Sequence, residues 1–146
     1  MQHALQTPEA DYILCECPID RLRELAERLE QRHQVEIVRQ PSVCLTMLRT
    51  EDSLEGQEFF LGETLTSECE VTVDGIPGYG LCMGDQPQRS YCLAVVDALL
   101  NDPSSQDRRE IDDFLKTDGS ALTESERREF NLTLRSQVNF KLMEQE

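Results

Sequence analysis

The residue types that most often carry catalysis are scarce in this chain and lack the spacing of known sites. The two histidines, His3 and His33, stand alone, one near the start of the sequence and one after a predicted helix. The chain has no GxxxxGK[ST] phosphate loop, no dinucleotide-binding fingerprint, no HExxH and no serine in the context of a nucleophile elbow. We therefore predict no catalytic residue and expect the isolated chain to be inactive.

Six cysteines raise the question of disulfides or a metal site. The first eleven residues lack the basic and apolar segments of a secretory signal, so a reducing compartment is expected. Cys15 and Cys17 with His33 are the best candidate metal ligands, but their spacing matches no common zinc pattern. We interpret the thiols as reduced core residues, and we predict that this chain holds no metal and binds no cofactor.

Two other polar groups favour structural roles. Glu63, Glu68 and Glu70 could form a carboxylate set, yet Glu68 and Glu70 fall on the exposed face of a predicted strand. Gly84-Asp85 stands at a strand-to-helix junction, where free amides could bind an anion. The Asp85 carboxylate would repel such an anion, so we predict that it caps the helix instead.

The charge distribution argues against several classes of ligand. The net charge is −15, and no Lys or Arg occurs between Arg49 and Arg89. Such a surface repels phosphate, which disfavours nucleic acid and anionic membranes as partners. A basic protein partner and plain solubility both remain as interpretations. With no apolar run of about 18 residues and no signal segment, we expect a cytoplasmic protein.

The first half of the chain predicts a helix followed by strands. Residues 18–32 carry apolar side chains at helical spacing. Residues 35–39 and 42–49 are β-rich and separated by Gln40-Pro41, which predicts two short strands or one interrupted strand. Residues 50–58 are expected to form a polar loop, and residues 1–11 to be flexible.

Residues 59–83 predict a central hairpin. Apolar and polar side chains alternate over residues 65–73, as in a strand with one buried face. Asp74-Gly75 supplies the left-handed residues of a tight turn. Gly62 indicates a bulge, and Pro77 indicates that the returning strand lies at an edge of the sheet.

The second half predicts helices that must cover this sheet. Residues 87–100 are apolar on almost every side, so this helix needs cover on more than one face. A short helix is predicted over 105–116, and another begins at a Thr123/Glu126 capping box and runs to about 136. Residues 138–142 fit a closing strand or a continued helix, with the strand preferred. These elements predict one α+β domain, residues 1–146: an antiparallel sheet built on a central hairpin and covered by helices mainly on one face.

Several segments resemble the PhnG family, a subunit of the bacterial carbon–phosphorus lyase system. They occur in the family's order and span nearly the whole chain: Val38-Arg39, Thr46–Arg49, Phe59–Thr66, Val73–Gly80, Val96–Leu100 and Arg135–Phe140. The chain departs from the family pattern at Asp85, Arg89 and Tyr91, where the family usually has Arg, His and Glu.

The resemblance implies a cytoplasmic transferase complex with PhnH-, PhnI- and PhnJ-like subunits. Such a complex makes a ribose 1-alkylphosphonate 5-triphosphate from ATP and an alkylphosphonate, releasing adenine. This chain is expected to be a non-catalytic or site-completing subunit, because its acidic sheet suits a triphosphate poorly. The alternative is a free-standing acidic protein-binding domain that dimerises through its apolar helix. An independent lyase or hydrolase is disfavoured, since no acid–base constellation occurs.

The sequence thus predicts that a basic partner docks on the apolar helix and the acidic hairpin. The expected contact residues are Phe59, Phe60, Gly62, Glu63, Glu68, Glu70, Arg89, Leu93 and Val96. The residues expected to form turns and a cap are Asp74, Gly75, Gly84 and Asp85.

Overall fold

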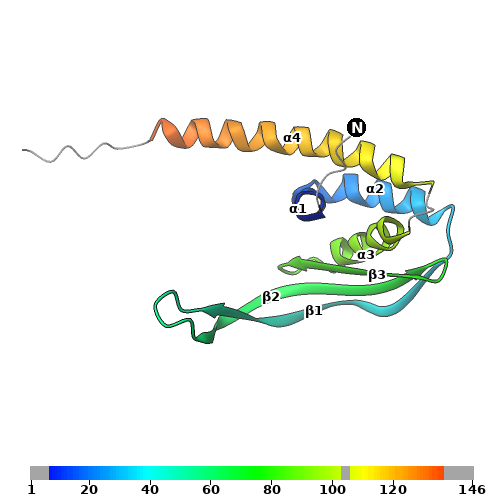
Figure 1. Cartoon of the computed structure of the whole chain (residues 1–146). Coiled ribbons are helices and arrows are strands. Elements are labelled where there is room, and N and C mark those ends of the chain that lie inside the picture. The colour runs from blue at the N-terminus through cyan, green and yellow to red at the C-terminus, as the bar shows by residue number, and fades with distance from the viewer. Residues whose placement is uncertain (1–6, 103–105, 137–146) are drawn as a thin grey trace, which may run out of the picture.

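The computed structural model describes residues 7–102 and 106–136, which form a layer of helices on one face of a three-stranded antiparallel sheet (Figure 1). The strand order is β1-β2-β3. The elements, in chain order, are α1 (Thr7–Glu16), α2 (Ile19–Glu30), β1 (Val35–Glu51), β2 (Glu58–Val73), β3 (Ile76–Met83), α3 (Pro87–Asn101) and α4 (Arg108–Leu134). The predicted α+β class and the one-sided helical cover are confirmed.

The β2–β3 hairpin turns as its residues predict. Asp74 and Gly75 have φ values of 51° and 85°, so both turn residues are left-handed, as a tight hairpin turn requires. β3 pairs only with β2, so Pro77 does lie in an edge strand, where a missing N–H costs little.

The core forms where α3 lies on the sheet. Cys69, Val71 and Val73 of β2 are fully buried, and the alternation predicted for this strand is confirmed there. On β3, Gly78 and Gly80 let the helix backbone approach closely: a Cβ on Gly80 would lie 1.8 Å from the carbonyl oxygen of Ser90. α3 therefore packs backbone to backbone against the edge strand.

The all-round apolar character of α3 has its explanation within this chain. α3 lies between the sheet and α2 (Figure 1), so both of its faces are covered. Leu93 is 7% exposed, and Val95 and Val96 are fully buried. The prediction that this helix needs cover on two sides is correct, and α2 supplies the second side through Leu22, Leu25 and Leu29.

The start of α3 differs from the prediction. The N-cap residue is Gln86, not Asp85, and the Gln86 side chain makes no capping bond to a backbone N–H of the helix. The fully buried Ser67 hydroxyl of β2 instead accepts the Gln86 N–H at 2.7 Å and donates to the Gly84 carbonyl at 2.8 Å. Gly84 has φ 86°, which turns the chain from β3 into this junction. A side chain of the sheet therefore holds this junction, and the predicted cap at Asp85 is wrong.

The long strands are irregular where the sequence indicated. β1 is one strand, and its pairing with β2 shifts on either side of Arg39, beside Gln40-Pro41. A third shift falls opposite Leu48 and Arg49, where the β2 register passes from Gly62 to Phe60. The bulge predicted at Gly62 is thus confirmed next to that residue. The strand extends to Glu51, into the region expected to be a loop.

Two helix predictions are wrong. α1 includes residues 7–11, which were expected to be flexible, and it buries Ala10, Ile13 and Leu14 in the core. α4 is one helix of 27 residues, where two were expected. Thr123 does not begin a helix, because its hydroxyl donates to the Gly119 carbonyl at 2.9 Å inside the continuous helix. Residues 138–142 lie outside the described residues.

Candidate interaction surface

The helices leave much of the sheet uncovered. β3 pairs with β2 only over Thr66–Val73, so the β1–β2 hairpin continues beyond it as a two-stranded arm (Figure 1). We call residues 45–65 the hairpin arm. It has the β1–β2 loop at its end, and no other element of the described chain pairs with it.

An apolar surface runs along β1 onto this arm. Directly opposed residues of an antiparallel pair share a face, so Ile37, Val43 and Leu45 lie on the same face as Val71, Ser67 and Leu65 of β2. That face is the one that packs against the helices, yet the helix layer ends before it reaches these side chains. We call the surface formed by Ile37, Val43, Leu45, Met47 and Leu65 the open face; its side chains are 41–63% exposed.

An acidic rim borders the open face. Glu63 lies directly across from Met47, and the arm also carries Glu51, Asp52, Glu55 and Glu58. Arg49 is its one basic residue, and the Arg49 guanidinium is already paired with Glu58 at 2.9 Å. The arm therefore joins an apolar strip to a negatively charged tip, a combination that suits an apolar partner surface with a basic border.

The predicted contact residues at the end of the arm are accessible. Phe59 is 46% and Phe60 is 61% exposed. A Cβ on Gly62 would meet nothing within 4 Å, and Glu63 is exposed. The structure thus brings Phe59, Phe60, Gly62 and Glu63 together on the arm.

The outer face of the sheet carries the two other predicted acids. Glu68 accepts hydrogen bonds at 2.8 Å from the Tyr79 hydroxyl and from the Arg39 guanidinium. These bonds, first that of Tyr79 and then that of Arg39, lower the pKa of Glu68. Glu68 is therefore part of a cross-strand network, whereas Glu70, on the same face, lies across from Arg39. The outer face is separate from the open face, on the opposite side of the sheet.

Three predicted contact residues are internal instead. Leu93 and Val96 lie in the core between the sheet and the helices. Arg89 is 7% exposed, and its guanidinium donates to the carbonyl oxygens of Leu14 and Cys17, both at 2.9 Å, at the end of α1. The prediction that these three form an outer surface is wrong, because α1 and α2 cover the helix that carries them.

The candidate metal ligands are engaged elsewhere. His33 contacts Asp74 through Nδ1 and Asp107 through Nε2, both at 2.6 Å, so it links the β2–β3 turn to the start of α4. Burial raises the pKa of the Cys15 and Cys17 thiols, and raises that of Cys92 to about 11. Within residues 7–102 and 106–136, no three His, Cys, Asp or Glu side chains gather as metal ligands.

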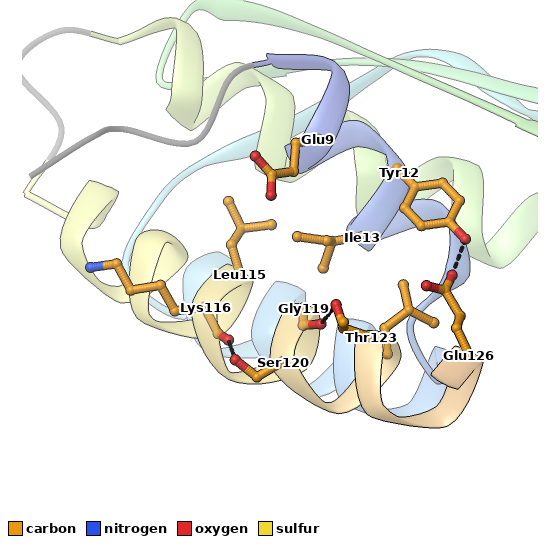
Figure 2. A pocket seen from close by; sticks show the side chains of 10 residues that line it. Glu9, Tyr12, Ile13, Leu115, Lys116, Gly119, Ser120, Thr123 and Glu126 are labelled. Carbon is orange, nitrogen blue, oxygen red and sulfur yellow. Dashed lines mark hydrogen bonds between the residues drawn. The ribbon is translucent and has the colours of Figure 1, made fainter. Parts of the chain in front are cut away.

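A groove between α1 and α4 was not predicted from the sequence. It has a volume of about 320 Å³. Figure 2 shows Glu9, Tyr12 and Ile13 of α1 facing Leu115 and Gly119 of α4, with the Tyr12 hydroxyl donating to Glu126. Its polar border is mainly acidic, because Lys116 is the one basic residue of the lining. This border disfavours a phosphate ligand.

Three arginines at the contact between α2 and α4 are paired with carboxylates. Arg21 pairs with Asp118, Arg28 with Glu110, and Arg32 with Asp107 and Glu110. These pairs join α2 to α4 and hold the helix layer together. These three guanidinium groups are therefore already engaged by carboxylates.

Sequence reasoning missed the residues of the open face on β1. A signal was present: Val43, Leu45 and Met47 alternate with Ser42, Cys44 and Thr46, the pattern of a strand with one apolar face. Residues 42–49 were predicted only as part of a strand, and the extent of the helix layer over that strand cannot be read from the pattern. Among the described residues, no helix is long and apolar enough to span a membrane.

Comparison with protein families gives a match over nearly the whole chain. A family model described as "Phosphonate metabolism protein PhnG" matches residues 9–145. No curated protein matches the chain. The match covers both the helix layer and the hairpin arm.

Proposed function

Because the chain belongs to the PhnG family of phosphonate metabolism proteins, we propose that it is a structural or site-completing subunit of an alkylphosphonate-activating complex. The complex would make a ribose 1-alkylphosphonate 5-triphosphate from ATP and an alkylphosphonate, with release of adenine. PhnH-, PhnI- and PhnJ-like proteins would be its partners, in the cytoplasm. Family membership itself establishes the coarser role, a part in phosphonate metabolism.

The observation that carries the proposal is the open face. Soluble monomers seldom leave large contiguous apolar patches in water, and such patches usually mark interaction sites. Here five apolar side chains continue the core face of the sheet past the helix layer. Four of them lie on β1, which within the described residues pairs on one side only. A second protein that extended the helix layer or the sheet would cover them.

The charge distribution favours a structural role for this subunit over nucleotide binding. The arm is acidic, and the arginines that join α2 to α4 are paired with carboxylates. Binding of ATP or of the triphosphate product needs cations or free amides that face the phosphates. We therefore assign the nucleotide chemistry of the complex to its other subunits, with no nucleotide held by this chain alone.

Reconstitution tests the proposal. The chain is purified alone and also co-expressed with the PhnH-, PhnI- and PhnJ-like proteins of the same genome, and adenine release from ATP plus methylphosphonate is measured. We expect no turnover from the chain alone, a stable complex on co-expression, and loss of activity when this chain is omitted. Turnover by the lone chain at about 1 per second, an ordinary enzyme rate, would contradict the proposal, as would a fully active complex that lacks the chain.

A further inference from the structure

The two edge strands of the sheet, β3 and β1, differ in how well their outward backbone groups are covered. On β3, the edge positions are occupied: Pro77 has no N–H, the Tyr79 N–H donates to the Asp97 carboxylate at 2.9 Å, and the Leu81 carbonyl accepts from the Cys15 thiol. Such devices protect an edge strand from pairing with another chain. The β3 edge is thus closed by α1 and α3.

The β1 edge has no comparable cover over Ser42–Leu48. Within the described residues, β1 pairs on one side only, with β2. The segment reads Ser-Val-Cys-Leu-Thr-Met-Leu, without a charge, a proline or a glycine. Long, apolar, uncharged edge strands are templates for addition of another strand. Pro41 and the two register shifts end this open stretch on its N-terminal side.

The outward-facing amides of this stretch can be identified from the register. The Gly84 N–H bonds to the Leu65 carbonyl at 2.8 Å, so the odd-numbered residues of β2 direct their backbone groups toward β3. The even-numbered residues therefore bond to β1, and Thr66 and Thr64 are paired with Cys44 and Thr46. By the same alternation, the N–H and C=O groups of Val43, Leu45 and Met47 point to the free edge.

From this arrangement we infer that a partner protein adds an extended strand to the β1 edge along Val43–Met47, with basic residues flanking that strand. Val43, Leu45 and Met47 carry both the outward backbone groups and three of the apolar side chains of the open face, so one added strand would contact both. The acidic rim, above all Glu63 beside Met47, selects the basic flanks. A second copy of this chain is a poor occupant, since each copy carries a net charge of −15.

This inference rests on the proposed function, because the partner is a subunit of the same complex. Hydrogen exchange on the free chain and on the co-expressed complex tests it. In the free chain, the amides of Cys44 and Thr46 should be protected, and those of Val43, Leu45 and Met47 should exchange fast. In the complex, exchange at these three should slow by roughly tenfold or more.

A substitution pair separates strand addition from simple packing on the open face. Leu45→Pro removes the outward N–H and leaves the bonds to β2 in place, as proline at an edge allows. Leu45→Val keeps that N–H and an apolar side chain. We expect Leu45→Pro to weaken association by about tenfold or more and Leu45→Val to change it by less than about threefold. Unchanged exchange of Cys44 and Thr46 in each free variant verifies the fold.

Each other outcome overturns the inference in a distinct way. A stable complex in which the amides of Val43, Leu45 and Met47 stay fast would leave the proposed function intact but show that no strand is added. Protection in the free chain that grows with its concentration would identify a second copy as the occupant. Failure of any complex to form would remove the proposed function and this inference together.

Discussion

One buried hydroxyl holds the junction between the sheet and α3. Ser67 bridges the Gln86 N–H and the Gly84 carbonyl, at 2.7 and 2.8 Å, and it is fully buried. The Ser67 side chain thus helps to determine where α3 begins, and a single substitution at this residue tests that role.

Ser67→Ala should lower the free energy of unfolding by about 1–3 kcal/mol, because it removes the hydrogen bonds of two partly buried backbone groups. Chemical denaturation measures the change. Ser42→Ala is the matched control, on an exposed position of β1, and should stay within about 0.5 kcal/mol of wild type. Equal stability of the two variants would show that the hydroxyl does not hold the junction.

His33 gives the fold a dependence on pH. Hydrogen bonds to Asp74 and Asp107 raise its pKa above the ordinary value of 6.5. A histidine with a raised pKa in the folded state contributes stability that is complete below its unfolded pKa and is lost as the pH rises through the folded value. The charged imidazole therefore joins the β2–β3 turn to α4 most strongly in acid.

His33→Gln should destabilise the protein by about 1 kcal/mol near pH 6 and by much less near pH 9. Denaturant titrations of both proteins at the two pH values give the difference. A stability difference that is the same at both values would mean that the charge of His33 contributes nothing.

At the scale of elements, the close contact between β3 and α3 depends on glycines, which have no side chain. A Cβ on Gly80 would lie 1.8 Å from the Ser90 carbonyl oxygen and 2.7 Å from the Ala94 nitrogen. Both obstacles are backbone atoms of the buried helix, so neither can rotate away. α3 itself would have to move off the sheet.

Gly80→Ala should therefore cost about 3 kcal/mol or more, visible as a lower melting temperature or loss of the folded state. Gly62→Ala is the control, since nothing lies within 4 Å of its Cβ position; it should change stability by about 1 kcal/mol at most. If the two variants melt together, the close approach of α3 is wrong.

At the scale of the whole molecule, charge and apolar surface meet on the arm. The net charge of −15 opposes self-association, while the acidic rim favours approach of a basic partner. At the proposed interface, the rim should affect the rate of encounter, and the open face should affect the lifetime of the complex.

Reversing two exposed rim acids, Glu55→Lys with Glu63→Lys, should slow association with the partner subunits by about tenfold at low salt and make it less salt-sensitive. Glu9→Lys with Glu24→Lys, on exposed positions of the helix layer, is the charge-matched control and should leave association near wild type. Surface plasmon resonance at two salt concentrations measures both. Identical rates for the two double variants would reduce the acidic arm to a solubility feature.

Local patterns in the sequence determined much of this protein. The helical spacing of Leu22, Leu25 and Leu29 and the left-handed turn at Asp74-Gly75 depend only on neighbours in the chain, and both were predicted correctly. The all-round apolar α3 correctly indicated cover on two sides. Family membership was also predicted, because short segments typical of the family occur in the family's order along the chain and can be recognised without the fold.

Tertiary structure decided what lies outside and what lies inside. The alternation in β1 resembles that in β2, yet Val71 is fully buried and Leu45 is 63% exposed. The difference arises because the helix layer is narrower than the sheet, and no local pattern encodes how far a distant helix reaches. Leu93, Val96 and Arg89 are internal because α1 and α2 cover α3, and this too depends on the packing of distant elements. The helix layer covers β3 and much of β2, and it leaves the same face of the sheet open along β1 for a partner.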